Sequence, residues 1–122
     1  MTPPKINLEA KFRTLGDRDY AVGIIAKMNN YEFKVVRFKG DFVWHSHPDT
    51  DETFIILDGV MKMNFREGTV EVHPGEMIVI PKGVEHKPSS LTGYKALLIE
   101  PEGVPNTGDV ANELTIQKPE WI

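Results

Sequence analysis

From Tyr20 onward the chain alternates between short apolar runs and clusters of turn residues. The runs are rich in Val, Ile, Phe and Tyr, which favour β-strands, and they recur at the spacing typical of sandwiches and barrels. This pattern predicts strands at residues 20–27, 31–38, 42–47, 52–57, 60–65, 70–73, 77–80, 85–88 and 94–100. Nearer the N-terminus, Leu8 and Phe12 lie one helical turn apart behind Asn7, a residue type suited to an N-cap. This spacing predicts one short helix at residues 7–13.

The residues between the apolar runs are suited to tight turns. Several pairs supply the positive or fixed φ angle that such turns demand: Asn29-Asn30, Asp58-Gly59, Glu67-Gly68, Pro74-Gly75 and Lys82-Gly83. Because most of these connections are short enough for hairpins, we expect antiparallel pairing. Antiparallel chains of this size usually form barrels or two packed sheets, which limit exposed strand edges. The expected fold class is therefore all-β.

One predicted strand is apolar on both faces. Residues 53–57 read Thr-Phe-Ile-Ile-Leu, whereas a half-exposed strand would alternate between apolar and polar residues. The outer face of this strand needs a cover, and the chain offers little helix to provide one. We therefore expect a second copy to cover it, which predicts a homodimer.

The C-terminal part of the chain has a different character from the strands. Prolines and glycines recur after Glu100, which predicts an irregular tail at residues 101–122. Apolar residues indicate that this tail docks on the core: Leu114, Ile116, Trp121 and Ile122. We expect a single domain spanning residues 1–122, with the core barrel at about residues 20–100.

Composition narrows the classes of function. Hydrophobic residues make up 40% of the 122 residues and charged residues 26%, which favours a folded globular protein. The net charge of -4, with no basic stripe, argues against a nucleic-acid partner. No apolar run is long enough to cross a bilayer and no signal-peptide core is evident, so we expect no membrane partner and a cytoplasmic protein. The chain has no cysteine, so a metal could bind only through His, Asp or Glu.

Candidate metal ligands lie at the ends of predicted strands. His45 and His47 are two residues apart on one strand, so both rings point to the same face. Glu52 begins the next strand, where its carboxylate can return beside the two rings. His86 follows the Pro81-Lys82-Gly83 turn at the start of another strand. These nitrogen and oxygen ligands suit Fe, Mn, Ni, Co, Cu or Zn, and they leave coordination positions open for a substrate.

Two alternatives to this ligand set stay open. Asp49 and Asp51 lie in the loop before Glu52 and could replace it as the oxygen ligand. The histidines could also line a polar barrel mouth without any metal. The remaining histidine, His73, precedes a Pro-Gly turn and is expected to be an exposed or capping residue.

The surroundings of the ligands follow from the alternation of side chains along a strand. If Glu52 points inward then Phe54 does too, which predicts an apolar pocket around the metal. Phe42 and Trp44 fall on the face opposite His45, so we expect them to pack away from the pocket.

The ligand spacing resembles the two sequence motifs of the cupin superfamily. The first motif matches Gly40, His45, His47, Glu52 and Gly59, and the second matches Gly75, Pro81, Gly83 and His86. The chain departs from the pattern at two points: the interval from Gly40 to His45 is one residue short, and Ser90 stands where the second motif ends in Asn. The whole chain resembles small single-domain bacterial cupins, often labelled mannose-6-phosphate isomerase-like or cupin 2 conserved barrel.

The resemblance implies a double-stranded β-helix, the jelly-roll cupin barrel, with a short N-terminal helix. It also implies one divalent metal ion, Fe, Mn, Ni or Zn, held by His45, His47, Glu52 and His86, and a small-molecule ligand. The expected function is that of a metal-dependent dioxygenase or isomerase acting on a small organic molecule, with Glu52 as the catalytic residue. The alternatives are a noncatalytic cupin that binds or senses a small ligand, and a structural cupin that has kept its ligands without doing chemistry.

Overall fold

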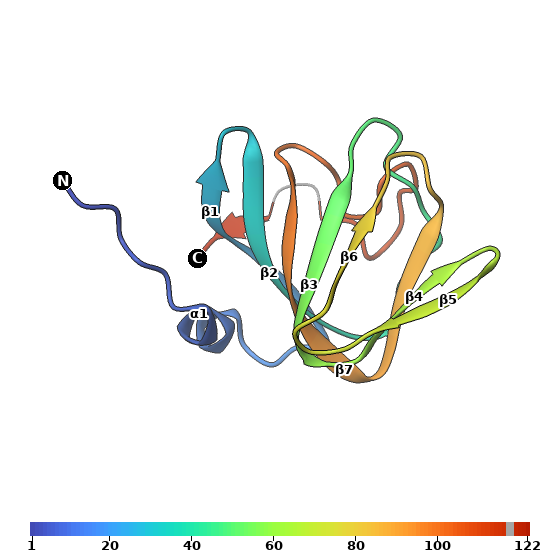
Figure 1. The fold of residues 1–122 in the computed structure, drawn as a ribbon, viewed down its shortest axis with the longest axis horizontal. Helices are drawn as coiled ribbons and strands as arrows, with labels where there is room; N and C mark the ends of the chain where they lie inside the picture. The colour runs from blue at the N-terminus through green and yellow to red at the C-terminus, as the bar shows by residue number, and fades with distance from the viewer. Residues whose placement is uncertain (117–118) are drawn as a thin grey trace.

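The apolar runs form strands in the computed structural model of the chain, which describes residues 1–116 and 119–122. The elements in chain order are α1 (Leu8–Leu15), β1 (Tyr20–Met28), β2 (Tyr31–Asp41), β3 (Glu52–Gly59), β4 (Met61–Phe65), β5 (Gly68–Val72), β6 (Met77–Ile80), β7 (His86–Pro101) and β8 (Glu120–Trp121). The expected all-β class with one short N-terminal helix is confirmed (Figure 1).

Strand β7, with 16 residues, connects the two walls of the fold. Its C-terminal part pairs with β2 on one side and β3 on the other, which gives a wall in the order β1-β2-β7-β3-β6. Its N-terminal part pairs with β4, and β4 with β5, to form the second wall. A register shift between Phe38 and Gly40 on β2 lets the sheet bend between the walls. Within the described residues the ladder does not close, so this jelly roll is an open one (Figure 1).

The prediction of a strand at residues 42–47 is wrong. This segment makes only an isolated bridge between His45 and His86. Three further backbone bonds hold it: the Phe42 amide donates to the Pro88 carbonyl, the His47 carbonyl accepts from the Gly83 amide, and the Ser46 carbonyl accepts from the Asp109 amide. Proline has no N–H to donate, so Pro88 cannot complete a ladder opposite the segment. The chain here is irregular, and this changes which side chains point inward.

Two further boundaries differ from the prediction. The strands expected at residues 85–88 and 94–100 are one continuous strand, β7, because β2 and β4 supply partners through the polar stretch between them. The last residues add a short strand, β8, which pairs in parallel with β1. The backbone amide of Ile122 donates to the carbonyl of Ile24, and the Lys11 ammonium donates to the Ile122 carbonyl.

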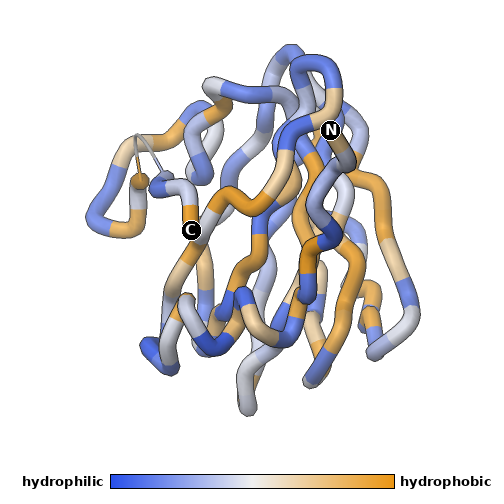
Figure 2. The backbone as a smooth tube through the Cα atoms, turned by 90° about the vertical axis from the view of Figure 1, so that its left-hand side faces the viewer, coloured by the Kyte–Doolittle hydropathy of each residue, from blue (hydrophilic) through white to orange (hydrophobic). Residues whose placement is uncertain are grey.

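The main core lies between the two walls. Phe54 and Ile56 of β3 and Met61 and Met63 of β4 are buried there, which settles which face of β4 looks inward. Burying each such side chain contributes about 1.5–3 kcal/mol. Figure 2 shows hydrophobic residues concentrated along the strands and hydrophilic ones at many of the connecting turns.

A smaller core lies outside the first wall, under helix α1. Asn7 caps the helix by accepting a hydrogen bond from the Ala10 amide, and Phe12 and Leu15 pack on β1 and β2 around Val35. The helix therefore covers the part of this wall formed by β1 and β2. In residues 1–116 and 119–122, no helix has the length and hydrophobicity needed to cross a membrane.

Candidate metal centre

The four predicted ligands come from three separate parts of the chain and meet in the interior. His45 and His47 lie on the irregular segment after β2, Glu52 begins β3 and His86 begins β7. One ligand atom from each lies within 4.8 Å of the others, and all four residues are buried. The group can hold a metal ion.

Backbone carbonyl groups fix two of the imidazole rings. Nδ1 of His45 lies 2.8 Å from the carbonyl oxygen of Val43, and Nδ1 of His86 lies 2.9 Å from that of Val84. In each case the carbonyl accepts a hydrogen bond from the N–H group at Nδ1. When such a ring is neutral, its lone pair is therefore on Nε2. This arrangement is typical of metal-binding histidines, whose second nitrogen is oriented by a neighbouring acceptor.

The contacts of Glu52 indicate where a cation belongs. Its Oε1 lies 3.1 Å from Nε2 of His86, and its Oε2 lies 3.3 Å from Nε2 of His47. In the neutral form of His86 the proton lies on Nδ1, and the Nε2 lone pair would then face a carboxylate oxygen. Neither ring nitrogen of His47 makes an aligned hydrogen bond within the described residues. A metal ion among these atoms would satisfy all of them, so the donor set fits a divalent cation.

The electrostatic environment keeps two of the ligands, His45 and Glu52, in their metal-binding protonation states. Burial lowers the pKa of His45 to about 4, with a further contribution from the neighbouring His86, so this ring is neutral at pH 7. Burial alone would raise the pKa of Glu52. The nearby His47, His86 and Glu100 side chains outweigh that effect and hold the pKa of Glu52 below its usual value. A neutral imidazole and an ionised carboxylate are the forms that bind metals.

The competing candidates lie outside the group. Asp49 and Asp51 are exposed, and Oδ1 of Asp51 accepts a hydrogen bond from the Lys82 amide. His73 is exposed, as expected, and lies 3.3 Å from a carboxylate oxygen of Glu71 on the surface. The structure thus brings together Glu52, rather than either aspartate, with the three buried histidines.

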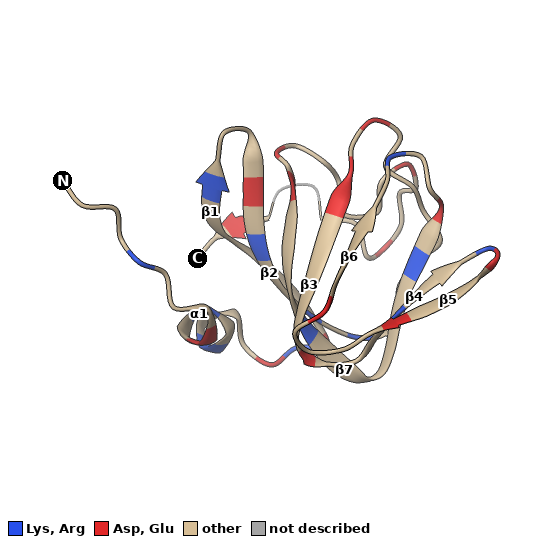
Figure 3. Ribbon diagram, in the orientation of Figure 1, with Lys and Arg blue, Asp and Glu red and all other residues tan. Residues whose placement is uncertain are grey.

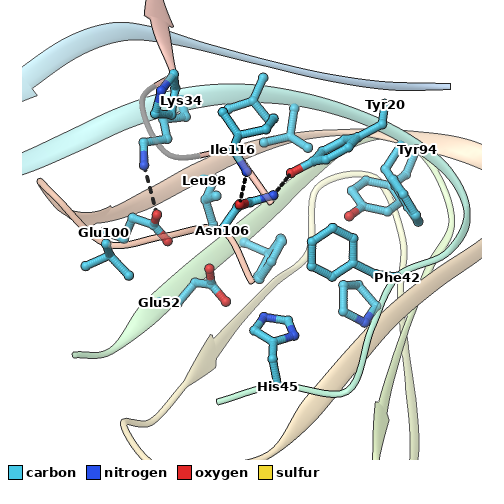
Figure 4. A pocket seen from close by; sticks show the side chains of 17 residues that line it. Tyr20, Lys34, Phe42, His45, Glu52, Tyr94, Leu98, Glu100, Asn106 and Ile116 are labelled. Atoms are coloured by element: carbon cyan, nitrogen blue, oxygen red, sulfur yellow. Dashed lines mark hydrogen bonds and ion pairs between the residues drawn. The ribbon is translucent and has the colours of Figure 1, made fainter. Parts of the chain in front are cut away.

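A cavity of about 40 Å³ adjoins the ligands inside the fold (Figure 4). Phe54 lines it together with His45 and Glu52, as expected for an apolar pocket beside the metal ligands. The expectation for Phe42 is wrong: it also lines the cavity, with its ring centroid 5.3 Å from that of His45. The irregular backbone of this segment removes the strand alternation on which that expectation depended. Trp44 packs elsewhere and is half-buried under the guanidinium of Arg66.

Sequence reasoning did not select four polar residues that line this cavity: Tyr20, Lys34, Glu100 and Asn106. Lys34 and Glu100 are buried and form an ion pair with Nζ 2.8 Å from Oε1. A signal was present, because each shares a strand face with apolar core residues. The partners are 66 residues apart, however, so the pairing that permits burial is invisible in either strand alone.

The irregular segment after β7 closes one side of the site. Asn106 donates to the Tyr20 hydroxyl and to the Leu114 carbonyl, and it accepts from the Ile116 amide. Farther along, Asp109 forms a pair of hydrogen bonds with the backbone of Ser46, the residue between two of the ligands. The segment therefore holds the backbone that carries His45 and His47.

Known proteins share this fold and sequence pattern. A crystal structure of a cupin-2 domain-containing protein from Shewanella frigidimarina superposes with a TM-score of 0.76 at 46% identity, covering 80% of this chain and 94% of that one. Protein NMB1881 from Neisseria meningitidis gives a TM-score of 0.70 at 29% identity, covering 81% and 100% of the two chains. Among curated sequences, the uncharacterized protein YdbB of Bacillus subtilis is 32% identical over 77 residues, which are 62% of this chain and 68% of YdbB.

The family follows from these matches and from the site. The model of the cupin domain family matches residues 34–100, a stretch that contains all four clustered ligands. The expected resemblance is confirmed, and this chain belongs to the cupin family.

Proposed function

We propose that the protein binds one divalent transition metal through His45, His47, Glu52 and His86, and that it uses this ion to bind and transform a small organic molecule. One observation carries the proposal. His86 donates a hydrogen bond from Nδ1 to the backbone carbonyl of Val84, and its Nε2 lies 3.1 Å from the Glu52 carboxylate in a buried site. When His86 is neutral, both of these atoms carry lone pairs, and a bound cation would satisfy them together.

Different residues of the chain would have different roles in the reaction. A bound divalent ion would supply Lewis-acid polarisation of a ligand oxygen or, for a redox-active metal, dioxygen chemistry. His45 and His86 hold the site rigid through their backbone acceptors. Glu52 acts as the catalytic residue, because its carboxylate can exchange ligation or hold a proton beside the ligand. The apolar cavity wall keeps water away from the reacting group.

These features support a metal-dependent dioxygenase or isomerase. Dioxygenase chemistry requires Fe or another redox-active metal, whereas isomerisation can also use Zn, Ni or Mn. The small volume of the cavity favours one second candidate, a noncatalytic protein that binds or senses a small ligand. Anaerobic reconstitution with Fe, Mn, Ni or Zn, followed by assays on 1,3-dicarbonyls, catechols and sugar phosphates, separates the two. Turnover of any of these compounds supports an enzymatic function. If no metal form turns over any of them, the result favours a noncatalytic binding function.

Elemental analysis tests the metal site. We expect about one divalent transition metal per chain in the native protein and a large loss in His86→Ala, because this substitution removes one ligand of the ion. The matched control is His73→Ala, which removes an exposed histidine outside the group. Equal metal content in His86→Ala and in the control contradicts the proposal.

We also propose that two copies associate through the outer face of β3 and β6. This face is apolar, and its exposed side chains include Leu57 at 38%, Met77 at 57% and Val79 at 50%. Strand β6 pairs only with β3 among the described strands, and it carries no charged residue (Figure 3). A twofold axis beside this edge would let the same patch cover itself in both copies.

A further inference from the structure

The cavity has a second polar end, next to the metal ligand Glu52. Lys34 and Glu100 line it and are almost fully buried, at 3% and 1% exposure. Nζ of Lys34 lies 2.8 Å from Oε1 of Glu100 and 3.6 Å from Oε1 of Glu32. In Figure 4 this pair lies on the side of the cavity away from His45.

One atom of this pair has no donor partner. Oε2 of Glu100 is buried and accepts no hydrogen bond from a donor group within the described residues. Burial and the neighbouring Glu52 carboxylate both raise the pKa of Glu100. Leaving a buried carboxylate oxygen unpaired costs free energy, so such atoms usually have a role or a ligand. Asn106 does not supply the missing partner, because its side chain already bonds Tyr20, Leu114 and Ile116.

The charges around Lys34 indicate which chemical group would fit. Two carboxylates already lie beside the single ammonium, so a further anionic group would be repelled rather than attracted. A neutral hydroxyl can accept a hydrogen bond from the ammonium and can donate one to the free oxygen of Glu100. It also fits if Glu100 is protonated, because a hydroxyl is both a donor and an acceptor.

We propose that Lys34 and Glu100 bind a hydroxyl group of the ligand, so that the ligand spans the cavity between this pair and the metal site. The inference rests on the proposed function only in placing the ligand's other end at the metal. The cavity of about 40 Å³ limits the ligand to a few heavy atoms. The ligand class is a short hydroxylated carbonyl or carboxyl compound, whose carbonyl or carboxylate oxygen faces the metal ligands.

A pair of isosteric acids tests this assignment. 3-Hydroxypropionate and butyrate differ only by a terminal hydroxyl in place of a methyl group. Titration calorimetry with the zinc-reconstituted full chain should show that 3-hydroxypropionate binds at least about tenfold more tightly, as expected for a hydrogen bond to a charged group. Equal affinity for the two acids, or tighter binding of butyrate, overturns the inference without the need for any variant.

A paired substitution locates the source of the preference. Lys34→Met/Glu100→Leu replaces both buried charges with apolar side chains of similar size, a change that commonly preserves the fold. We expect it to lose the preference for the hydroxylated acid. The control Lys27→Met/Glu102→Leu makes the same kind of change in an exposed ion pair and should keep the preference. A preference that persists in the folded Lys34→Met/Glu100→Leu protein overturns the assignment.

Metal content, measured on the same samples, separates this inference from the proposed function. A wild-type chain that takes up no metal contradicts the metal site, while its relative affinity for the two acids still decides the role of the pair. A chain that takes up metal but does not distinguish the acids leaves the metal site standing and overturns the role of Lys34 and Glu100.

Discussion

His45 and His86 are oriented by the same local device. Each ring places its Nδ1 near the carbonyl of the residue two positions earlier, Val43 or Val84. Since this contact involves only adjacent backbone, the ring orientation is set before any metal is bound. Such preorganisation raises metal affinity because less conformational freedom is lost on binding.

The buried histidine His45 predicts a pH dependence for the metal-free protein. Its pKa is about 4 in the folded chain and about 6.5 when unfolded, so the unfolded chain binds more protons between these values. Stability should therefore fall as the pH falls from 6.5 to 4, with a contribution from His45 of about 3 kcal/mol. Urea unfolding of metal-free protein at several pH values measures this.

Glu100 complicates the total, because burial and the nearby Glu52 raise its pKa and give a contribution of opposite sense. The His45→Gln variant isolates the histidine, since the other groups stay in place. Its stability should fall less between pH 6.5 and pH 4 than that of the wild type. Parallel pH profiles for the two proteins would show that His45 is not held neutral by the fold.

The sequence identified the metal ligands, but for the polar pair it held only the weak signal that each charge shares a strand face with apolar residues. The short spacing of His45, His47 and Glu52 marks one end of a strand pair, so local pattern was enough to select them. That Lys34 and Glu100 pair with each other becomes evident only from the register of β2 and β7, which brings them together inside the cavity.

Among the elements, the irregular segment that carries His45 and His47 depends on the C-terminal part of the chain. The residues around Gly108 lie directly against its backbone: a Cβ on Gly108 would overlap the Ser46 carbonyl oxygen, and φ at this glycine is 58°. Only glycine fits this position without strain.

The substitution Gly108→Ala should therefore weaken both the fold and the metal site. We expect a loss of about 1–3 kcal/mol in the free energy of unfolding, because backbone must shift and the φ angle is unfavourable. Metal affinity should fall as well, since Ser46 lies between His45 and His47. Urea unfolding and a competition titration with a zinc chelator measure the two effects.

The matched control is Gly68→Ala at the start of β5. A Cβ there meets nothing within 4 Å, and the backbone is not in the left-handed region. This variant should keep the stability and the metal affinity of the wild type. If Gly108→Ala behaves like Gly68→Ala, the C-terminal segment does not support the site.

Most strands were predictable because their apolar runs and turn residues are local signals. The exceptions have a common cause in tertiary pairing. Pro88 prevents residues 42–47 from forming a ladder, and β2 and β4 join two expected strands into β7. A proline's effect on the opposite segment is not visible until the pairing is known.

For the whole molecule, the outer face of the first wall is covered unevenly. Helix α1 packs over β1 and β2, whereas Met77 and Val79 on β6 remain exposed. The apolar run on β3 predicted that this face needs a cover, and the homodimer remains a prediction.

Sedimentation velocity at micromolar concentration tests the dimer. We expect the wild type to sediment as a dimer and Val79→Glu as a monomer, because association would bury an unpaired carboxylate. The control is Val70→Glu on β5, where the valine is 45% exposed and lies outside the proposed face. A monomeric wild type, or a Val79→Glu variant that stays dimeric, contradicts the proposed interface.

Anomalous X-ray diffraction from crystals of the zinc-reconstituted protein tests the metal site most directly. We expect one anomalous peak per chain, at about 2.0–2.2 Å from a nitrogen of each of the three histidines and from a carboxylate oxygen of Glu52. A peak elsewhere, or no peak among these four side chains in fully loaded crystals, would contradict it.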